Sequence, residues 1–506
     1  MKIAFRVDAS VHMGSGHISR CLTLAEALRE RGAETEFICR EHPGNLCDQI
    51  EACGHRVSRL FATDRKFHGD WNPHAPWLGV DRQQDAEETL AKLAAAGGQF
   101  DWLVVDHYAI DCEWESRLRT AVRQIAVIDD LADRPHDCDL LLDQNLYDEM
   151  KNRYDGLLPI RCRQLLGPKY ALLRPEFTLE RGCLRSRDGS VQRILVFFGG
   201  CDLGNETGKA LGALRAAEFK DVIVDVVVGA GNPHRQEIES LCRGLSQVKF
   251  HCQVTNMAEL MAAADLSLGA GGVTTWERCA MGLPGLVVAV ARNQEGLAAY
   301  GAEKGLFFFL GASEVVTMER IREALRVFTR SPESLRAFSA SGLAAVDGKG
   351  AQRLVGILMP PSIHLRGACL EDCDAILEWR NAEVTRRYIF DPQPISRNAH
   401  RAWLHKTLAN PDRALLVGEI DGKPVGVLRY NLCGDEALIS VYLVPGCEGQ
   451  GVGSQLIRSG SLWLRKNQPH LKVVNAEIQS SNIASIRAFT WAGFQKHHVT
   501  YQEVLQ

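Results

Sequence analysis

The feature that most constrains the fold is a strand that passes through two glycines into a helix, at Gly14-Ser15-Gly16-His17. Residues 2–8 alternate in the manner of a strand, and apolar side chains then recur at helical spacing from Ile18 to Leu28, which predicts a helix packed on a sheet. His17 falls in the first turn, where free N–H groups favour anionic ligands. The histidine favours a ligand site over the alternative, a purely structural turn.

The length of 506 residues exceeds what one hydrophobic core supports and predicts about three domains. The net charge is −4 and no basic block occurs, which disfavours a nucleic-acid partner. No apolar run reaches the ~20 residues of a membrane span, so we expect a cytoplasmic protein without a membrane partner. The 16 cysteines are scattered without a Cys-x-x-Cys pair, which predicts neither a zinc site nor a disulfide scaffold.

Polar residues follow two further apolar runs in the first 170 residues. Asp106, His107 and Tyr108 come after the run at 102–105, and Asp129 comes after the run at 124–128. Ligands of doubly wound sheets bind at the carboxyl ends of parallel strands, so we expect these side chains to line a crevice. The alternative for each acid is a cap on the following helix.

A second unit of the same kind begins at residue 193. Its first strand, 194–198, leads into Gly199-Gly200, and a later strand, 266–268, leads into Gly271-Gly272 and a helix from Thr274. The amides of the Gly271-Gly272 turn suit a diphosphate. Glu277 is placed to accept hydrogen bonds from ribose hydroxyls or, alternatively, only to favour the helix dipole. Two such halves predict a cleft for a nucleotide-activated substrate.

Four separated segments carry a resemblance: 14–20, 105–108, the proline-containing crossover 166–177, and 271–277 with Asn293-Gln294. Together they resemble the UDP-sugar hydrolases of pseudaminic acid biosynthesis, which are similar to GT-B glycosyltransferases. The resemblance covers roughly residues 1–345. It implies hydrolysis of UDP-2,4-diacetamido-2,4,6-trideoxy-β-L-altropyranose to UDP and free sugar without a metal, and it makes His17 the general base that activates water.

The substrate-binding residues predicted from these segments and from the resemblance are Asp8, Gly16, Arg20, Asp106, Tyr108, Gly199, Gly200, Gly271, Gly272, Thr274, Glu277, Asn293 and Gln294.

A new pattern begins after Met359-Pro360-Pro361. Residues 414–420 and 425–432 predict a hairpin, 438–443 a third strand, and 449–454 a glycine-rich loop before a helix, which suits a diphosphate. With a strand at 473–478 and Gly493-Phe494, this order resembles the GNAT-type N-acetyltransferases and implies acetyl-CoA as cosubstrate. The implied contacts are Leu443, Gly449, Gln450, Gly451, Val452, Gly453, Ser454, Asn482 and Ser485.

Two residues depart from the GNAT pattern. Glu448 occupies a loop position where Arg or Gln is usual, and Phe489 stands where many members carry the tyrosine that protonates the departing thiolate. Glu477, beside the cofactor, is the residue we expect to relay the amine proton through water, the alternative being an exposed strand residue. The opening Trp379-Arg380-Asn381 favours the branch that includes the acetyltransferase of the same sugar pathway.

The sequence therefore predicts an α/β protein with two Rossmann-like halves, 1–170 and 171–358, in a GT-B-like arrangement, followed by a GNAT domain at 359–506. We expect a bifunctional enzyme that acetylates UDP-4-amino-4,6-dideoxy-N-acetyl-β-L-altrosamine and hydrolyses the product. Three alternatives stay open: a GT-B glycosyltransferase with an attached acetyltransferase, the same chemistry on a related 2,4-diacetamido sugar, and a binding module regulated by acetyl-CoA. The expected partners are small molecules, and the oligomeric state is not predicted.

Overall fold

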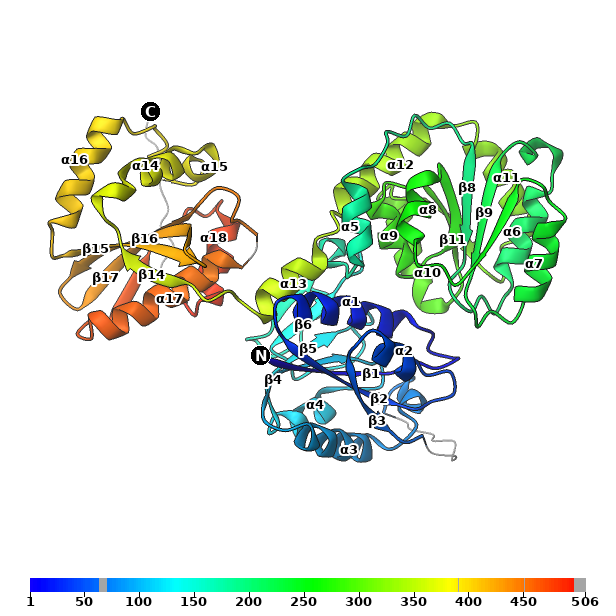
Figure 1. Cartoon of the computed structure of the whole chain (residues 1–506), viewed down its shortest axis with the longest axis horizontal. Coiled ribbons are helices and arrows are strands. Elements are labelled where there is room, and N and C mark those ends of the chain that lie inside the picture. Colours follow the sequence, from blue (N-terminus) through cyan, green and yellow to red (C-terminus); the bar gives the residue numbers. More distant parts are fainter. Residues whose placement is uncertain (63–70, 390, 450, 496–506) are drawn as a thin grey trace. The chain divides into compact units, whose positions relative to one another are not determined.

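The computed structural model describes residues 1–62, 71–389, 391–449 and 451–495 (Figure 1). The chain divides into two compact units, Met1–Leu354 and Val355–Gln506. Unit 1 contains two parallel sheets and unit 2 contains one mixed sheet.

The first sheet of unit 1 has seven strands in the order β3-β2-β1-β4-β5-β6-β7, and every strand pair in it is parallel. The order reverses direction between β1 and β4, which makes their carboxyl ends the expected ligand site of this sheet. Its elements are β1 (Lys2–Val7), α1 (Gly16–Glu30), β2 (Glu34–Arg40), α2 (Cys47–Ala52), β3 (Arg56–Leu60), η1 (Ala75–Leu78), α3 (Arg82–Ala95), β4 (Phe100–Asp106), α4 (Cys112–Leu118), β5 (Val122–Ile128), β6 (Leu140–Asp143) and β7 (Arg163–Leu166).

The second sheet has the same plan, with six parallel strands in the order β10-β9-β8-β11-β12-β13. The order in which strands are added to it reverses between β8 and β11. Apolar clusters cover both of its faces. Its elements are η2 (Pro168–Tyr170), α5 (Pro175–Arg181), β8 (Arg193–Phe197), α6 (Glu206–Leu214), η3 (Ala217–Phe219), β9 (Ile223–Val228), α7 (Arg235–Arg243), β10 (Val248–Cys252), α8 (Met257–Ala263), β11 (Leu266–Ala270), α9 (Thr274–Ala280), β12 (Gly285–Ala289), α10 (Arg292–Glu303), β13 (Phe308–Ala312), α11 (Met318–Phe328) and α12 (Pro332–Ala345).

Unit 2 has a five-stranded sheet, β14-β15-β16-β17-β18, in which only the β17–β18 pair is parallel. Helices α14 and α16 lie on one side of this sheet and α17 on the other (Figure 1). Its elements, after α13 (Gly350–Leu358) at the junction of the units, are β14 (His364–Gly367), η4 (Leu370–Asp372), α14 (Cys373–Asn381), α15 (Glu383–Arg386), α16 (Arg397–Leu408), β15 (Arg413–Ile420), β16 (Lys423–Cys433), β17 (Glu436–Leu443), α17 (Val452–Asn467), β18 (Val473–Ala476) and α18 (Ile483–Trp491).

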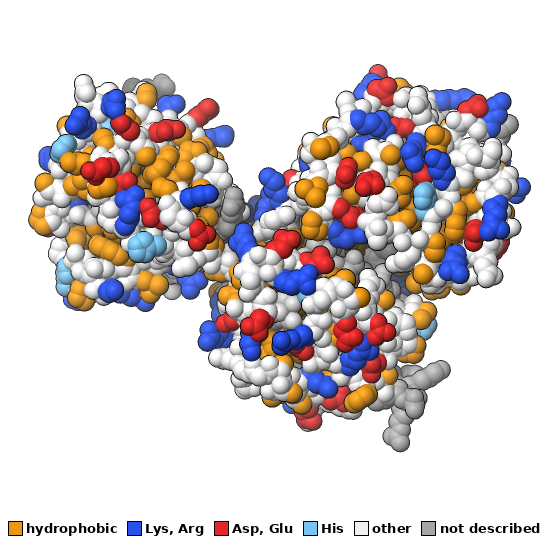
Figure 2. Space-filling model, viewed as in Figure 1, with side chains coloured by type: hydrophobic (Ala, Val, Ile, Leu, Met, Phe, Trp, Pro, Cys, Tyr) orange, Lys and Arg blue, Asp and Glu red, His pale blue; other side chains and the backbone are white. Residues whose placement is uncertain are grey.

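Each strand predicted from an apolar run is present within a few residues of its predicted bounds. The predicted crossover at 166–177 contains η2 and the start of α5 at Pro175, where proline at the first helical position costs no hydrogen bond. Among the described residues, no helix has the length and apolarity needed to cross a membrane. On the face drawn in Figure 2, acidic and basic side chains are interspersed, without a broad patch of one sign.

Candidate active sites

His17 lies at the point where the strand order of the first sheet reverses, between β1 and β4. It occupies the first turn of α1, which follows β1, and Asp106 is the last residue of the neighbouring strand β4. His17 Nδ1 is 2.6 Å from Asp106 Oδ1, and the histidine is 9% exposed. Gly14, with φ of 75°, makes the turn that brings the chain from β1 into α1.

Arg20, one turn further along α1, binds the same carboxylate with two hydrogen bonds. Its Nε and Nη2 each donate to Asp106 at 2.6 Å. Burial alone would raise the pKa of Asp106, but the charges of Arg20 and His17 outweigh burial and hold that pKa well below its usual range. Because an ionised carboxylate only accepts hydrogen bonds, we assign the proton to Nδ1 of His17, which leaves the Nε2 lone pair available.

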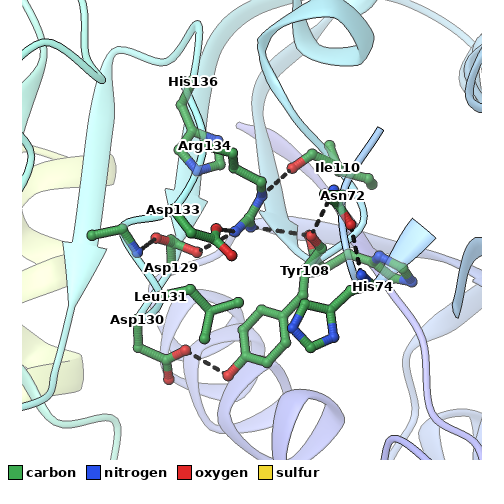
Figure 3. Close-up of polar contacts among 12 residues, drawn as sticks. Asn72, His74, Tyr108, Ile110, Asp129, Asp130, Leu131, Asp133, Arg134 and His136 are labelled. Atoms are coloured by element: carbon green, nitrogen blue, oxygen red, sulfur yellow. Dashed lines mark hydrogen bonds and ion pairs between the residues drawn. The ribbon is translucent and has the colours of Figure 1, made fainter. Parts of the chain in front are cut away.

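A second acid, Asp130, contacts both Tyr108 and Arg20; Figure 3 shows its contact with the Tyr108 hydroxyl. The Tyr108 hydroxyl donates to Asp130 Oδ1 at 2.5 Å, and Arg20 Nη1 donates to Asp130 Oδ2 at 3.1 Å. The loop that carries Asp130 is held by Arg134, whose Nε donates to the carbonyl oxygen of Ile110 at 2.7 Å. Tyr108 is therefore fixed beside His17, with the ring centroids 4.7 Å apart.

Two aromatic residues that the sequence reasoning missed extend this surface. Trp77, from η1, stacks on Tyr108 with a centroid distance of 5.6 Å and lies edge-on to His17 at 6.4 Å. His74 contacts both rings, at 4.7 Å from Trp77 and 5.2 Å from Tyr108. These residues come from a proline-rich segment with no strand or helix periodicity. The only feature of the sequence that could have indicated a ligand-contacting surface there was the tryptophan.

Asp8 directly follows β1 and is 1% exposed. Its Oδ1 accepts hydrogen bonds of 2.7 Å from Arg6 Nη1 and from the Arg40 amide. Its Oδ2 faces Nε2 of His107 at 3.3 Å and Nε2 of His42 at 3.6 Å. This carboxylate is thus enclosed by protein groups, which makes support of the carboxyl ends of β1 and β4 its visible role.

In the second half, the predicted glycine turn lies between β11 and α9. A Cβ built on Gly272 would lie 3.5 Å from Gln294 Nε2, so Gln294 of α10 is brought to this turn. The Gln294 Oε1 atom accepts a hydrogen bond from the Val290 amide at 3.1 Å. Thr274 begins α9 and is half-buried, whereas Asn293 is exposed on α10. Gly199 and Gly200 form the turn after β8, at the same edge of the sheet.

Glu277, in the first turn of α9, is half-buried, and its carboxylate accepts no hydrogen bond from the residues that the structure describes. Burial raises its pKa from 4.5 to about 6, although the nearby charge of Arg174 acts in the opposite direction. A carboxylate with unmet hydrogen-bonding capacity suits a ligand that supplies hydroxyl donors.

The two halves of unit 1 meet close to these sites. A Cβ built on Gly16 would lie 3.9 Å from the side chain of Val273, the residue that precedes α9. Trp276 is fully buried, and its indole Nε1 donates to Asn145 Oδ1 at 2.9 Å. The amide Nδ2 of Asn145 donates in turn to Asp130 Oδ2 at 3.2 Å. A chain of hydrogen bonds therefore links the His17 network to the helix that carries Glu277.

A separate pocket of about 180 Å³, lined in part by Lys2, Glu34 and Arg56, lies at the amino ends of the first-sheet strands, away from His17. Within the described ranges, no group of three or more His, Cys, Asp and Glu side chains is arranged to hold a metal ion.

The predicted cofactor loop of unit 2 is shaped by glycines with positive φ. Gly449 and Gly451 have φ of 76° and 78°, and Gly451 caps α17. Ser454 Oγ donates to the carbonyl oxygen of Gly451 at 3.0 Å. The Glu448 carboxylate accepts a hydrogen bond from the Gly446 amide at 2.8 Å, so it already occupies one donor near the loop. The predicted contact Gln450 lies outside the described residues.

The other predicted residues of unit 2 occupy different environments. Leu443 is half-buried at the end of β17, next to the glycine loop that also supplies Val452 and Gly453. Asn482 Oδ1 accepts from the Ser485 amide at 3.0 Å and so caps α18. Glu477 is exposed just beyond β18. Phe489 is 5% exposed and packs in the core.

Comparison with known proteins relates different parts of the chain to different proteins. Residues 362–495 match the acetyltransferase (GNAT) domain family. A Campylobacter jejuni protein named UDP-2,4-diacetamido-2,4,6-trideoxy-beta-L-altropyranose hydrolase is 26% identical over 308 residues, which are 60% of this chain and 97% of the hydrolase. An uncharacterised protein of Methanocaldococcus jannaschii is 23% identical over 98% of this chain and 97% of its own length. The crystal structure of Acinetobacter baumannii MurG superimposes with a TM-score of 0.48 at 12% identity, covering 71% of this chain and 99% of MurG.

The two doubly wound sheets and the GNAT match define the class of protein, an α/β region of two parallel sheets joined to an acetyltransferase domain, and they confirm the predicted α/β fold class. More particularly, the chain is homologous to UDP-2,4-diacetamido-2,4,6-trideoxy-β-L-altropyranose hydrolase over 60% of its length and carries a GNAT domain at its C-terminal end, which confirms the resemblance found in the sequence. These assignments support enzyme activity and imply that the domain binds acetyl-CoA or CoA.

Proposed function

We propose that this chain is a bifunctional enzyme of pseudaminic acid biosynthesis. Unit 2 transfers an acetyl group from acetyl-CoA to UDP-4-amino-4,6-dideoxy-N-acetyl-β-L-altrosamine. Unit 1 hydrolyses the product, UDP-2,4-diacetamido-2,4,6-trideoxy-β-L-altropyranose, to UDP and the free sugar. The observation that carries the hydrolase proposal is the 2.6 Å contact between His17 and Asp106 at the point where the strand order of the first sheet reverses.

In the hydrolysis, His17 is the general base. Asp106 accepts a hydrogen bond from Nδ1–H and thereby keeps the Nε2 lone pair available, and no described residue forms a hydrogen bond to Nε2. Nε2 takes a proton from water while the water oxygen forms a bond to the anomeric carbon, and the bond from that carbon to the diphosphate oxygen breaks. UDP leaves with the electron pair, and the Gly272 amide donates a hydrogen bond to its diphosphate. The Gly271 amide cannot make the contact predicted for it, because that amide donates to the Val288 carbonyl oxygen at 3.1 Å.

The sugar lies beside His17 in this proposal. The rings of Trp77, Tyr108 and His74 form a mostly apolar surface next to the base, which suits the 6-methyl and acetamido methyl groups of a deoxygenated sugar. Glu277 accepts hydrogen bonds from the ribose hydroxyls, because its carboxylate has no donor among the described residues. The two contacts distinguish the sugar end from the nucleoside end of the substrate.

In the acetyl transfer, the neutral 4-amino group attacks the thioester carbonyl of acetyl-CoA. The nitrogen–carbon bond forms, the carbon–sulfur bond breaks, and the sulfur leaves with the electron pair. Glu477 accepts the amine proton through water, in keeping with its exposed position next to the end of β18. Phe489 has no proton to give, so the thiolate of CoA is protonated from solvent.

An NMR time course with the full chain and the UDP-4-amino sugar tests both reactions. With acetyl-CoA we expect UDP and free diacetamido sugar, and without it an unchanged substrate. The variant His17→Ala should stop at the UDP-diacetamido sugar, whereas His12→Ala, which removes an exposed histidine nearby, should behave as the wild type. Release of CoA with an intact UDP-sugar in the wild type would reject the hydrolase and favour a glycosyltransferase. No release of CoA would reject the acetyltransferase substrate.

A further inference from the structure

Three arginines converge on the face of the unit 2 sheet that α14 and α16 cover. Arg413 comes from β15, Arg429 from β16 and Arg380 from α14. In the strand register, Arg413 pairs with Asn431, and Arg429 pairs with Ser440 of β17. Because side chains alternate between faces, Arg413, Asn431, Arg429 and Ser440 share one face. We call Arg380, Arg413 and Arg429 the arginine cluster.

No member of the arginine cluster forms an ion pair with a carboxylate of the described residues. Arg380 Nη2 donates to the backbone carbonyl of Asp391 at 2.9 Å, and Arg413 Nη1 donates to Thr407 Oγ1 at 3.4 Å. The Nη1 atom of Arg380 and the Nε atom of Arg429 are buried without a hydrogen-bond partner.

Two other arginines of the same unit are paired with carboxylates. Arg366 binds Asp372 and Glu419 at 2.7 to 2.8 Å, and Arg397 binds Asp374. In the arginine cluster, by contrast, burial and the charge of Arg413 lower the pKa of Arg429. Like charges that are partly buried with unused donors are costly unless an anion occupies the space between them, and guanidinium groups match phosphate oxygens in shape.

The arginine cluster lies on the reaction side of the sheet. The paired ladder between β17 and β18 ends at Ile439 and Ala476, so the two strands are unpaired beyond these residues. Tyr442, half-buried on the same face as Arg429, follows on β17, and alternation along β18 places Glu477 on that face as well. In the proposed function, the glycine loop at the end of β17 binds acetyl-CoA. The arginine cluster is therefore available to bind the acetyl acceptor.

We propose that the arginine cluster binds the phosphate oxygens of the acetyl acceptor, so that the acetyltransferase recognises an amine carried on a nucleoside diphosphate and not the free amino sugar. The inference rests on the proposed function, and it adds which end of the acceptor the domain holds and with which residues. Binding of the diphosphate at the arginine cluster leaves the amine free to approach the thioester between β17 and β18.

Acetyl transfer by the full chain tests the arginine cluster. Arg429→Gln and Arg413→Gln should each raise the KM for the UDP-4-amino sugar about tenfold or more, as expected for loss of a charge-assisted hydrogen bond, with an unchanged KM for acetyl-CoA. Arg401→Gln is the matched control, because Arg401 is an exposed cation on α16 of the same unit. UDP-sugar hydrolysis by unit 1 should be unchanged. An unchanged acceptor KM, or equal rises in both KM values, would overturn the proposal.

Hydrogen exchange of the full chain with inorganic pyrophosphate separates this inference from the proposed function. We expect protection of peptides within 413–431 in the wild type and in Arg401→Gln, and none in Arg429→Gln. If the UDP-4-amino sugar is not acetylated but this protection is present, the anion site stands and the substrate assignment falls. Absence of protection over 413–431 in the wild type would refute the anion site whatever the substrate.

Discussion

The raised pKa of Glu277 predicts opposite effects of Glu277→Gln on stability and on ligand binding. A rise in pKa from 4.5 to about 6 corresponds to about 2 kcal/mol by which burial disfavours the ionised carboxylate. The folded state therefore binds this proton more tightly than the unfolded state, and stability falls as pH rises between these two values. Glu277→Gln should increase the free energy of unfolding by up to about 2 kcal/mol at pH 8 and by little at pH 4, relative to the wild type.

Binding of a UDP-hexose, whose diphosphate diester keeps its charge over this range, supplies the second measurement. Hydroxyl donors favour the ionised carboxylate, so wild-type affinity should fall about tenfold between pH 8 and pH 5, where about one Glu277 in ten is ionised. The variant should bind more weakly at pH 8 and lose this dependence. Calorimetric titrations at both pH values, with chemical unfolding alongside, measure both effects. A variant that binds as well as the wild type at pH 8, or keeps its pH dependence, would refute the ribose role.

Three further predictions follow from other contacts. His17→Ala should lower hydrolysis about 10²- to 10⁴-fold while acetyl transfer is retained, which separate assays of UDP and CoA release would measure; a smaller loss would contradict the general-base role. Trp276→Phe should cost about 1–3 kcal/mol of stability in chemical unfolding, because it removes the donor to the buried Asn145 carbonyl; an unchanged unfolding midpoint would argue against that bond. Glu448→Gln should tighten acetyl-CoA binding in calorimetry, because it removes a negative charge beside the glycine loop, and weaker binding would show that Glu448 supports the loop.

The local pattern alone was sufficient for the strand, glycine turn and helix at His17 and for the repeat of that plan at Gly271-Gly272. Short-range periodicity and glycine positions decide these features, and they are present in the sequence itself. The same kind of information predicted the glycine loop before α17 and the placement of Asp106 at a strand end. The roles given to the individual site residues stay predictions.

Only the tertiary structure decided which of these residues meet. Asp106 lies 89 positions after His17, and the contact exists because β1 and β4 are neighbours in the sheet, an arrangement that no local pattern encodes. The bond from Trp276 to Asn145 spans 131 positions for the same kind of reason. The arginine cluster depends on strand register and on the position of α14. Strand pairing between distant segments brings such residues together, and the free energy of that pairing depends on the packing of the whole core. The sequence by itself therefore determined the local elements that carry the site residues, and the tertiary packing determined which of those residues contact one another.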